Sequence, residues 1–315
     1  MNLRAQDFRP VPCGANALGG AAAESNGADA RGAPIGVFDS GIGGLSVLRA
    51  LRAEMPHEHF VYLDDSLHAP YGERGDAHVS ARSHRIARHL NDHHAVKAMV
   101  VACNTATMAA VASLRSAYPR LPIVGIEPGL KPAAAASRTR HVGVMATRGT
   151  IGSARFAALM ASLGDQATFV PRACDGLADA IQQSLASDNE AAIASLCEHH
   201  LGAMGRFGCG AGEMDVLVLG CTHYVFAEAH LRRLLPRGVR VVSTAEAVAR
   251  RTRQLLAACD GLAEGGEGTL RMVTSGEPGL LHAAARRWLT PGADEARQDS
   301  LAADEAAPSL PGQAA

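Results

Sequence analysis

Residues 100–110 read VVACNTATMAA and join an apolar run to a polar, hydroxyl-rich segment at Cys103. The apolar part has the continuous hydrophobic character of a parallel strand that is covered on both faces. The residues after Cys103 have the pattern of a helix start. This stretch therefore predicts a thiol at the carboxyl end of a strand, next to the first turn of a helix.

The same order of residues recurs at 215–226, DVLVLGCTHYVF, where Cys221 stands between an apolar run and polar hydrogen-bond donors. Two further segments also correspond. PIGVFDSGIGG (34–44) and HVGVMATRGTIG (141–152) each run from a strand through a polar residue into a glycine-containing loop. The repeat predicts two related halves, each of which delivers one thiol to a shared pocket if the halves face each other across a cleft.

Short apolar runs alternate with helical patterns along the rest of the chain. The strand candidates are IGVFD (35–39), HFVYLD (59–64), KAMVVAC (97–103), PIVGIE (122–127), HVGVMAT (141–147), ATFVPR (167–172), DVLVLGC (215–221), RVVST (240–244) and RMVTS (271–275). This alternation favours a doubly wound α/β architecture, in which ligands bind beyond the carboxyl ends of the strands. We therefore predict two doubly wound parallel-sheet domains related by pseudo-symmetry, with the site in the cleft between them.

Composition limits the classes of protein to which the chain can belong. It has 315 residues, 47% of them hydrophobic and 19% charged, as expected of a globular protein. A formal net charge of -1 argues against a nucleic-acid surface. No run is long and apolar enough for a membrane helix, and no signal peptide is evident. Seven cysteines without a C-x-x-C pair favour reduced thiols, so we expect a cytoplasmic protein.

Two thiols on facing walls suit racemisation. A proton must leave one face of a carbon and another must arrive on the opposite face, so two fixed acid/bases avoid any turning of the substrate. A helix N-terminus can lower a thiol pKa, and the residues after Cys103 and Cys221 offer donors for a carboxylate. A single cysteine at the end of a strand is usually a small buried hydrophobe, but two in matching contexts favour chemistry.

Two other chemistries fit less well. Zinc needs about four close ligands, and the nearest candidates, CEHH (197–200) and the His89/His93 pair, have the pattern of solvated helix faces. The loop DSGIGGLS (39–46) has Ser46 at the third glycine position of a dinucleotide fingerprint and no P-loop lysine. We therefore predict no metal site and no nucleotide.

Several motifs in order resemble glutamate racemase, of the cofactor-independent aspartate/glutamate racemase family. They are PIGVFDSGIGGLSVLRAL (34–51), VYLDDSLHAPYG (61–72), VVACNTAT (100–107), GIEPG (125–129), GVMATRGTIGSARF (143–156) and VLGCTHY (218–224). The resemblance extends from about Pro34 to about Leu256. It implies interconversion of L- and D-glutamate, supply of D-glutamate for peptidoglycan, and a cytoplasmic homodimer that binds a small-molecule substrate.

The resemblance also implies site residues. The catalytic acid/bases would be Cys103, which acts on D-glutamate, and Cys221, which acts on L-glutamate. Asp39 and His223 would assist these thiols. The substrate-binding residues would be Asp39, Ser40, Tyr71, Gly72, Asn104, Thr105, Thr222 and His223. No cofactor is expected, because a pyridoxal enzyme needs a Schiff-base lysine, and neither Lys97 nor Lys131 stands at the carboxyl end of a strand.

The family also returns to its first domain at the end of the chain. Since RVVST and RMVTS follow the second cysteine unit, we expect both strands to rejoin the first domain. The first domain is then 34–129 plus 242–288 and the second is 130–241. The biased composition of 1–33 and 289–315 predicts a disordered arm and a disordered tail.

Three residues depart from the family pattern. Val225 stands where proline is usual, Asp175 where proline is common, and Gln182 where an acidic residue is common. The last two leave no auxiliary carboxylate to assign in that segment. Two alternatives stay open: an aspartate racemase, whose pocket would be one methylene shorter, and a non-catalytic binding protein on the same fold.

Overall fold

Two parallel sheets form the framework of the computed structural model, which describes residues 31–187, 189–289 and 297–300. The first sheet has the order β10-β9-β2-β1-β3-β4 and the second the order β6-β5-β7-β8. The strands of the first are β1 (Ile35–Asp39), β2 (Phe60–Asp64), β3 (Ala98–Val101), β4 (Ile123–Gly125), β9 (Leu270–Thr274) and β10 (Arg297–Ser300). Those of the second are β5 (His141–Ala146), β6 (Thr168–Ala173), β7 (Val216–Gly220) and β8 (Arg240–Val242).

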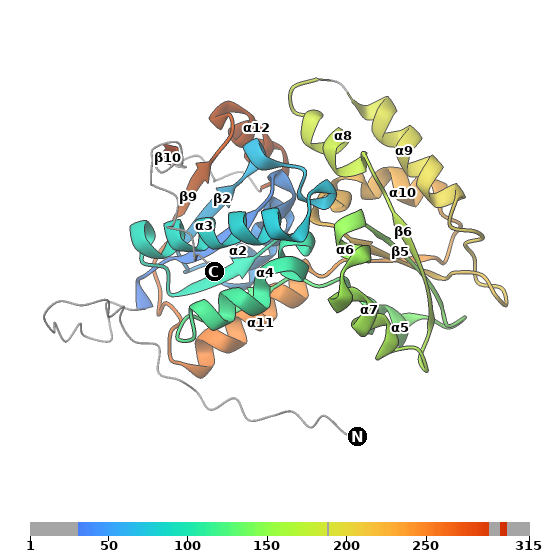
Figure 1. The fold of residues 1–315 in the computed structure, drawn as a ribbon, viewed down its shortest axis with the longest axis horizontal. Helices are drawn as coiled ribbons and strands as arrows, with labels where there is room; N and C mark the ends of the chain where they lie inside the picture. The colour runs from blue at the N-terminus through green and yellow to red at the C-terminus, as the bar shows by residue number, and fades with distance from the viewer. Residues whose placement is uncertain (1–30, 188, 290–296, 301–315) are drawn as a thin grey trace, which may run out of the picture.

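The two sheets share one topology. In each, the first strand lies between the second and the third, with the fourth beyond the third, and every pair is parallel. β3 and β7 therefore occupy equivalent places, and Cys103 and Cys221 follow them at equivalent ends. The predicted fold class, with two doubly wound sheets, is confirmed. Figure 1 shows the resulting two bodies side by side.

Helices cover both faces of the first sheet, which explains why β1, β2 and β3 are apolar apart from the aspartates that end β1 and β2. Ile35 and Val37 face a core shared with α2 (Leu45–Glu54), α11 (Ala245–Ala258) and α12 (Pro278–Trp288). Phe38 faces the opposite core, shared with α3 (Asp76–His94) and α4 (Asn104–Ala117). Since successive side chains of a strand point to opposite faces, a sheet covered on both sides needs apolar residues throughout.

The second sheet is covered in the same way. Val142 and Val144 of β5 face a core with α5 (Leu130–Ala136) and α7 (Ala154–Ala161). Leu217 and Leu219 of β7 face the other core, with α8 (Leu177–Gln183), α9 (Glu190–Gly202) and α10 (Glu228–Leu234). The shorter α6 (Arg148–Gly152) follows β5. Both halves thus present the carboxyl ends of a buried parallel sheet.

Of the two strands that we expected to rejoin the first domain, RMVTS pairs in the first sheet and RVVST does not. RMVTS forms β9 and pairs with β2 in the first sheet, as expected. RVVST contributes β8, which pairs with β7 in the second sheet. The connection 235–239 after α10 is short, so the chain completes this pair before it leaves the second half. The chain returns to the first half at 243–244. There the Thr244 hydroxyl donates a hydrogen bond of 3.0 Å to the carbonyl of Glu127, which lies where the chain first passes from the first half to the second.

The ends of the chain differ in part from the expected arm and tail. Residues 297–300 form β10 and pair with β9, although the tail was expected to lack structure. Arg31, which belongs to the predicted arm 1–33, forms ion pairs with Asp260 and Glu264. Residues 1–30, 290–296 and 301–315 lie outside the described part of the chain. The exact domain boundaries remain a proposal. No helix in the described residues is both long and apolar enough to cross a membrane.

Candidate active site

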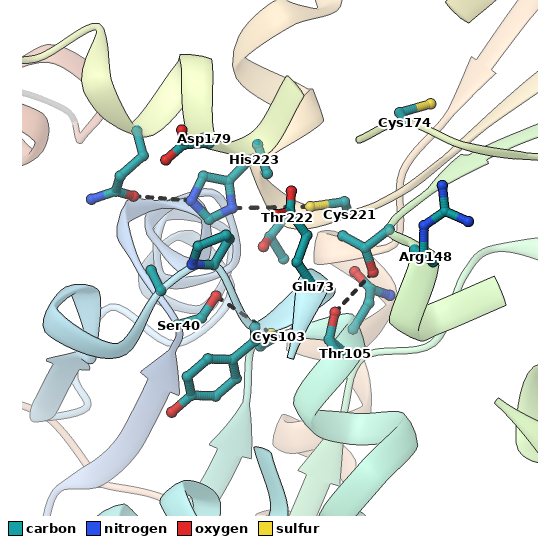
Figure 2. A pocket seen from close by; sticks show the side chains of 18 of the residues that line it. Ser40, Glu73, Cys103, Thr105, Arg148, Cys174, Asp179, Cys221, Thr222 and His223 are labelled. Atoms are coloured by element: carbon teal, nitrogen blue, oxygen red, sulfur yellow. Dashed lines mark hydrogen bonds between the residues drawn. The ribbon is translucent and has the colours of Figure 1, made fainter. Parts of the chain in front are cut away.

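A cavity lies where the carboxyl ends of the two sheets meet, and residues from both halves line it (Figure 2). The first half contributes Ser40, Ala69, Pro70, Tyr71, Gly72, Glu73, Cys103, Asn104 and Thr105. The second half contributes Thr147, Arg148, Cys174, Asp175, Gly176, Ala178, Asp179, Gln182, Cys221, Thr222, His223 and Tyr224. The cavity thus brings together every predicted site residue except Asp39, which lies behind its wall.

Cys103 caps the N-terminus of α4. Its sulfur accepts a hydrogen bond from the Ala106 backbone N–H at 3.5 Å, and its thiol lies 3.7 Å from the Ser40 hydroxyl oxygen. The residue is 5% exposed. Burial raises the pKa of this thiol well above its usual range, and the nearby Asp39 carboxylate adds to the rise. The neutral thiol is therefore favoured at Cys103.

Cys221 precedes a 3-10 helix, η4 (Thr222–Ala227). Its sulfur lies 4.0 Å from Nδ1 of His223. Burial raises the pKa of the Cys221 thiol to about 12, against the lowering effect of the His223 and Tyr224 backbone N–H groups. The net shift of the thiol pKa is thus upward, although a lowered pKa is what the helix start alone would give. The backbone donors act in the expected direction, but desolvation outweighs them.

Asp39 connects the two halves from beneath the cavity. Its Oδ1 accepts from the Ser40 backbone N–H at 2.7 Å, and its Oδ2 accepts from the Thr222 hydroxyl at 3.0 Å. The side chain is fully buried, and this burial raises its pKa to about 7. Hydrogen bonds from Ser40, Cys103 and Thr222 lower the pKa but do not cancel the burial. Asp39 is therefore placed to exchange a proton near neutral pH.

His223 has partners on both sides of its ring, as Figure 2 shows. Nε2 lies 3.0 Å from Oε1 of Gln182, and Nδ1 faces Cys221. Burial lowers the pKa of the imidazole to about 4, because the charged form loses its hydration. The ring is therefore neutral at neutral pH. A neutral imidazole next to a thiol can act as its base.

Tyr71 and Gly72 both line the cavity, and the hydroxyl of Tyr71 is already hydrogen-bonded within the protein. The Tyr71 hydroxyl donates to Oδ2 of Asp65, whose carboxylate also accepts two hydrogen bonds from Arg82. At Gly72, a Cβ atom would lie 2.6 Å from Cβ of Thr147, so the missing side chain lets the two halves approach. Tyr71 therefore supplies a ring wall, and Gly72 a close contact across the cleft.

Thr105 meets the second half directly. Its hydroxyl lies 2.9 Å from that of Thr147, which caps α6. Sequence reasoning did not place Thr147 or Arg148 in the site. A signal was present, because both follow β5 in the segment that corresponds to the loop after β1. Arg148 forms an ion pair with Asp175 on the cavity wall.

Three other lining residues, Glu73, Cys174 and Asp179, had no such signal. Glu73 and Asp179 belong to short helical segments whose orientation depends on packing. Cys174 follows β6 and reaches the cavity wall. Its thiol donates to the Arg172 carbonyl at 3.4 Å, and burial holds its pKa above the usual range.

A family model and curated proteins of similar sequence both point to one racemase family. The family model described as Asp/Glu/Hydantoin racemase matches residues 45–252. The glutamate racemase of Pseudomonas putida is 45% identical over 252 residues, which cover 80% of this chain and 92% of that protein. The glutamate racemase of Pseudomonas aeruginosa is 44% identical over 246 residues, which cover 78% and 90%.

Solved structures agree with these relatives. A glutamate racemase from Bacillus anthracis superposes with a TM-score of 0.76 at 29% identity and covers 86% of this chain and 98% of its own. The Escherichia coli glutamate racemase in complex with L-glutamate and the activator UDP-MurNAc-ala gives a TM-score of 0.70 at 30% identity, covering 81% and 95%. The family model and the identity over most of the chain show that this chain belongs to the Asp/Glu/hydantoin racemase family.

Proposed function

We propose that the chain is a glutamate racemase that interconverts L- and D-glutamate with two cysteine acid/bases. The observation that carries this proposal is the placement of Cys103 and Cys221. They follow equivalent strands, β3 and β7, and line one cavity from opposite halves. The relatives of highest similarity given above carry the name glutamate racemase, which supports glutamate as the substrate.

The reaction needs one thiolate and one thiol at a time. In the L-to-D direction, the Cys221 thiolate removes the α-proton of L-glutamate and becomes a thiol. The electron pair of the C–H bond stays on the substrate, and the Cys103 thiol then donates its proton to the opposite face. Cys103 is left as the thiolate, which is the base for the D-to-L direction. Catalysis of each transfer requires a correctly placed acid or base near the carbon.

The surroundings of the thiols supply the remaining roles. Asp39 and His223 are the proton-exchanging neighbours of Cys103 and Cys221, respectively. Ser40, Asn104, Thr105 and Thr222 present hydroxyl and amide groups to the cavity, and the N-terminus of α4 favours an anionic group. These groups suit the carboxylates of glutamate. Tyr71 and Gly72 shape the wall next to them.

No organic cofactor enters this proposal. Lys97 lies at the amino end of β3, where its ammonium pairs with Glu58. Lys131 is exposed on α5. Neither belongs to the cavity wall, so neither is placed to form a Schiff base with a substrate there. The proposed chemistry therefore belongs to the two thiols.

The biological role follows from the product. We propose that the enzyme supplies D-glutamate for peptidoglycan biosynthesis in the cytoplasm, and so contributes to the cell wall and cell shape. We also propose that it acts as a homodimer, which sedimentation equilibrium would test.

The test of function is racemisation itself. Purified protein is incubated with L-glutamate, D-glutamate, L-aspartate or D-aspartate, and optical activity is followed by circular dichroism. We expect both glutamate enantiomers to reach an equal mixture, with kcat/KM for aspartate at least about tenfold lower, since one methylene discriminates by that order. Comparable turnover of aspartate would favour the aspartate racemase. Binding of glutamate without racemisation would favour the non-catalytic alternative.

A further inference from the structure

Gln182 on α8 holds together two loops that flank the two thiols. Its Oε1 lies 3.0 Å from the backbone nitrogen of Ile42, in η1 (Ile42–Gly44) of the first half. The same oxygen lies 3.0 Å from Nε2 of His223 in the second half. One side-chain oxygen thus meets two nitrogens that belong to different halves of the molecule.

The backbone contact fixes which way the amide points. A backbone N–H can only donate, so the atom of Gln182 that faces Ile42 must be the oxygen. An oxygen cannot donate in this amide, so the ring nitrogen that shares it must carry a proton. The backbone N–H of Ile42 can only donate, so it determines both the orientation of the Gln182 amide and the tautomer of His223.

The tautomer decides what the other ring nitrogen can do. A neutral imidazole has one N–H, and here that proton is on Nε2. Nδ1 therefore keeps its lone pair and faces the Cys221 sulfur at 4.0 Å. Only the thiol has a proton to give in this pair. Burial, which lowers the pKa of His223 to about 4, keeps the ring in this neutral form near neutral pH.

The glycines of the first loop make room for this arrangement. A Cβ atom at Gly41 would lie 2.4 Å from Oε1 of Gln182, and one at Gly43 would lie 2.4 Å from Nδ1 of His223. Both distances are far below van der Waals contact. The glycine-rich segment that superficially suggests a nucleotide loop is thus required for the backbone to approach the glutamine and the imidazole.

We propose that Gln182 is a positioning residue that holds His223 in its Nε2–H form, so that Nδ1 accepts the proton of the Cys221 thiol. The proposal rests on the proposed racemase function. The S–H bond breaks, its electron pair stays on sulfur, and the proton forms an N–H bond at Nδ1. The imidazolium then releases this proton to solvent, and the thiolate is the base for the α-proton of L-glutamate.

A neutral amide in this place has a consequence of its own. The titratable groups that line the cavity with His223 are Cys221, Cys103, Cys174, Glu73, Asp175, Asp179, Arg148, Tyr71 and Tyr224, and Asp39 lies behind Thr222. Gln182 is the group in hydrogen-bond contact with Nε2, and it brings no charge. A carboxylate there would favour the imidazolium and leave Nδ1 protonated at higher pH.

Two variants of Gln182 test separately the role of its side-chain oxygen and the role of its lack of charge. Gln182→Met keeps the length of the side chain and removes the oxygen, whereas Gln182→Glu keeps an oxygen and adds a charge. Gln183→Met and Gln183→Glu are the matched controls, because Gln183 is the next residue of α8 and is exposed. The control variants are expected to behave as the wild type in both measurements below.

The first measurement does not depend on turnover. Nitrogen-15 NMR of histidine-labelled protein gives the protonation of each ring nitrogen, and His223→Asn identifies the His223 signals. We expect an Nε2–H imidazole in the wild type and a shift toward Nδ1–H in Gln182→Met. A wild-type His223 with its proton on Nδ1 overturns the proposal whatever the variants do. The same result with an active enzyme leaves the racemase function intact.

The second measurement is the pH profile of kcat/KM for glutamate. Gln182→Glu should move the acid limb upward by about one pH unit or more, because the base is lost when the imidazole is protonated. Above that limb the variant should recover most of the wild-type rate. Gln182→Met should lose about tenfold in kcat at every pH, with a smaller change in KM. An unmoved acid limb in folded Gln182→Glu overturns the proposal.

Discussion

The surroundings of Cys103 and Cys221 are equivalent in backbone and different in chemistry. Both thiols follow the third strand of their sheet, and burial raises the pKa of both. Cys103 has a carboxyl neighbour, Asp39, whose pKa is raised to about 7, while Cys221 has an imidazole neighbour, His223, whose pKa is lowered to about 4. The pseudo-symmetry therefore positions the sulfurs but does not duplicate their proton-exchanging partners.

Burial shifts the pKa values of Asp39 and His223 in opposite directions. Desolvation disfavours a charged group, so it raises the pKa of a carboxyl and lowers that of an imidazole. Asp39 is driven toward its protonated form and His223 toward its deprotonated form. The cavity thus brings an acid and a base to its two thiols while keeping the buried charge low. Three predictions test this difference, in order of expected effect.

Loss of either thiol should have the largest effect. Cys103→Ala and Cys221→Ala each leave one acid/base on one face, so racemisation should fall by about a hundredfold or more. Cys103→Ala should still exchange the α-proton of L-glutamate slowly with solvent, and Cys221→Ala that of D-glutamate. Circular dichroism measures racemisation, and deuterium uptake seen by NMR measures the exchange.

Cys197→Ala is the matched control for these variants, because Cys197 is a fully buried thiol of α9 that does not line the cavity. It should retain racemisation. Near-wild-type racemisation in folded Cys103→Ala or Cys221→Ala would contradict the two-thiol reaction. Equal exchange of both enantiomers by each variant would contradict the assignment of one thiol to each face.

The two neighbours should also affect the pH dependence of stability in opposite ways. Between pH 3.8 and about 7 the folded state holds a proton on Asp39 that the unfolded chain has lost, so this contribution to the free energy of unfolding falls as pH rises. Between about 4 and 6.5 the unfolded chain holds a proton that folded His223 lacks, so its contribution rises with pH.

Single variants should reveal these opposed slopes. From about pH 4 to 6.5, the free energy of unfolding of Asp39→Asn should rise with pH more steeply than that of the wild type, while that of His223→Asn should fall relative to it. Each change in slope should be at most about 1.4 kcal/mol per pH unit. Urea denaturation at several pH values measures it. Parallel profiles for wild type and both variants would show that the two groups do not differ as described.

The smallest effect is expected at the lysines. Lys131→Arg should leave kcat/KM for glutamate unchanged, and so should removal of pyridoxal phosphate by hydroxylamine and dialysis. The reason is that the exposed Lys131 lies away from the cavity wall. An assay of both enantiomers provides the measurement. A large loss of activity from either treatment would mean that a third reactive group takes part beside the two thiols.

Local patterns were sufficient for the strands and for the two thiols. The apolar runs before Cys103 and Cys221 require parallel strands with both faces covered, and the polar residues after them require turns at the carboxyl ends. The repeat of this pattern also predicts that the two units are equivalent. Each of these inferences depends on residues that are neighbours in the sequence.

The remaining features depend on contacts between distant residues. RVVST has the same character in either sheet, and only the short connection before β8 settles that it pairs with β7. The direction of the thiol pKa shifts depends on how completely the halves close over the sulfurs. In the sequence, Gln182 was only a departure from the family pattern that left no auxiliary carboxylate to assign, and its role depends on its contacts with Ile42 and His223.

The polar contacts across the cleft join substrate access to catalytic alignment. The bonds from Thr222 to Asp39, from Ile42 to Gln182 and between Thr105 and Thr147 each connect one half to the other. Separation of the halves about the crossings at 127–129 and 243–244 would break all of these bonds together. It would also free the Gln182 amide to rotate and the His223 proton to change nitrogen. The alignment of His223 with Cys221 therefore depends on the contact between the two halves, and a molecule with separated halves would lose both together.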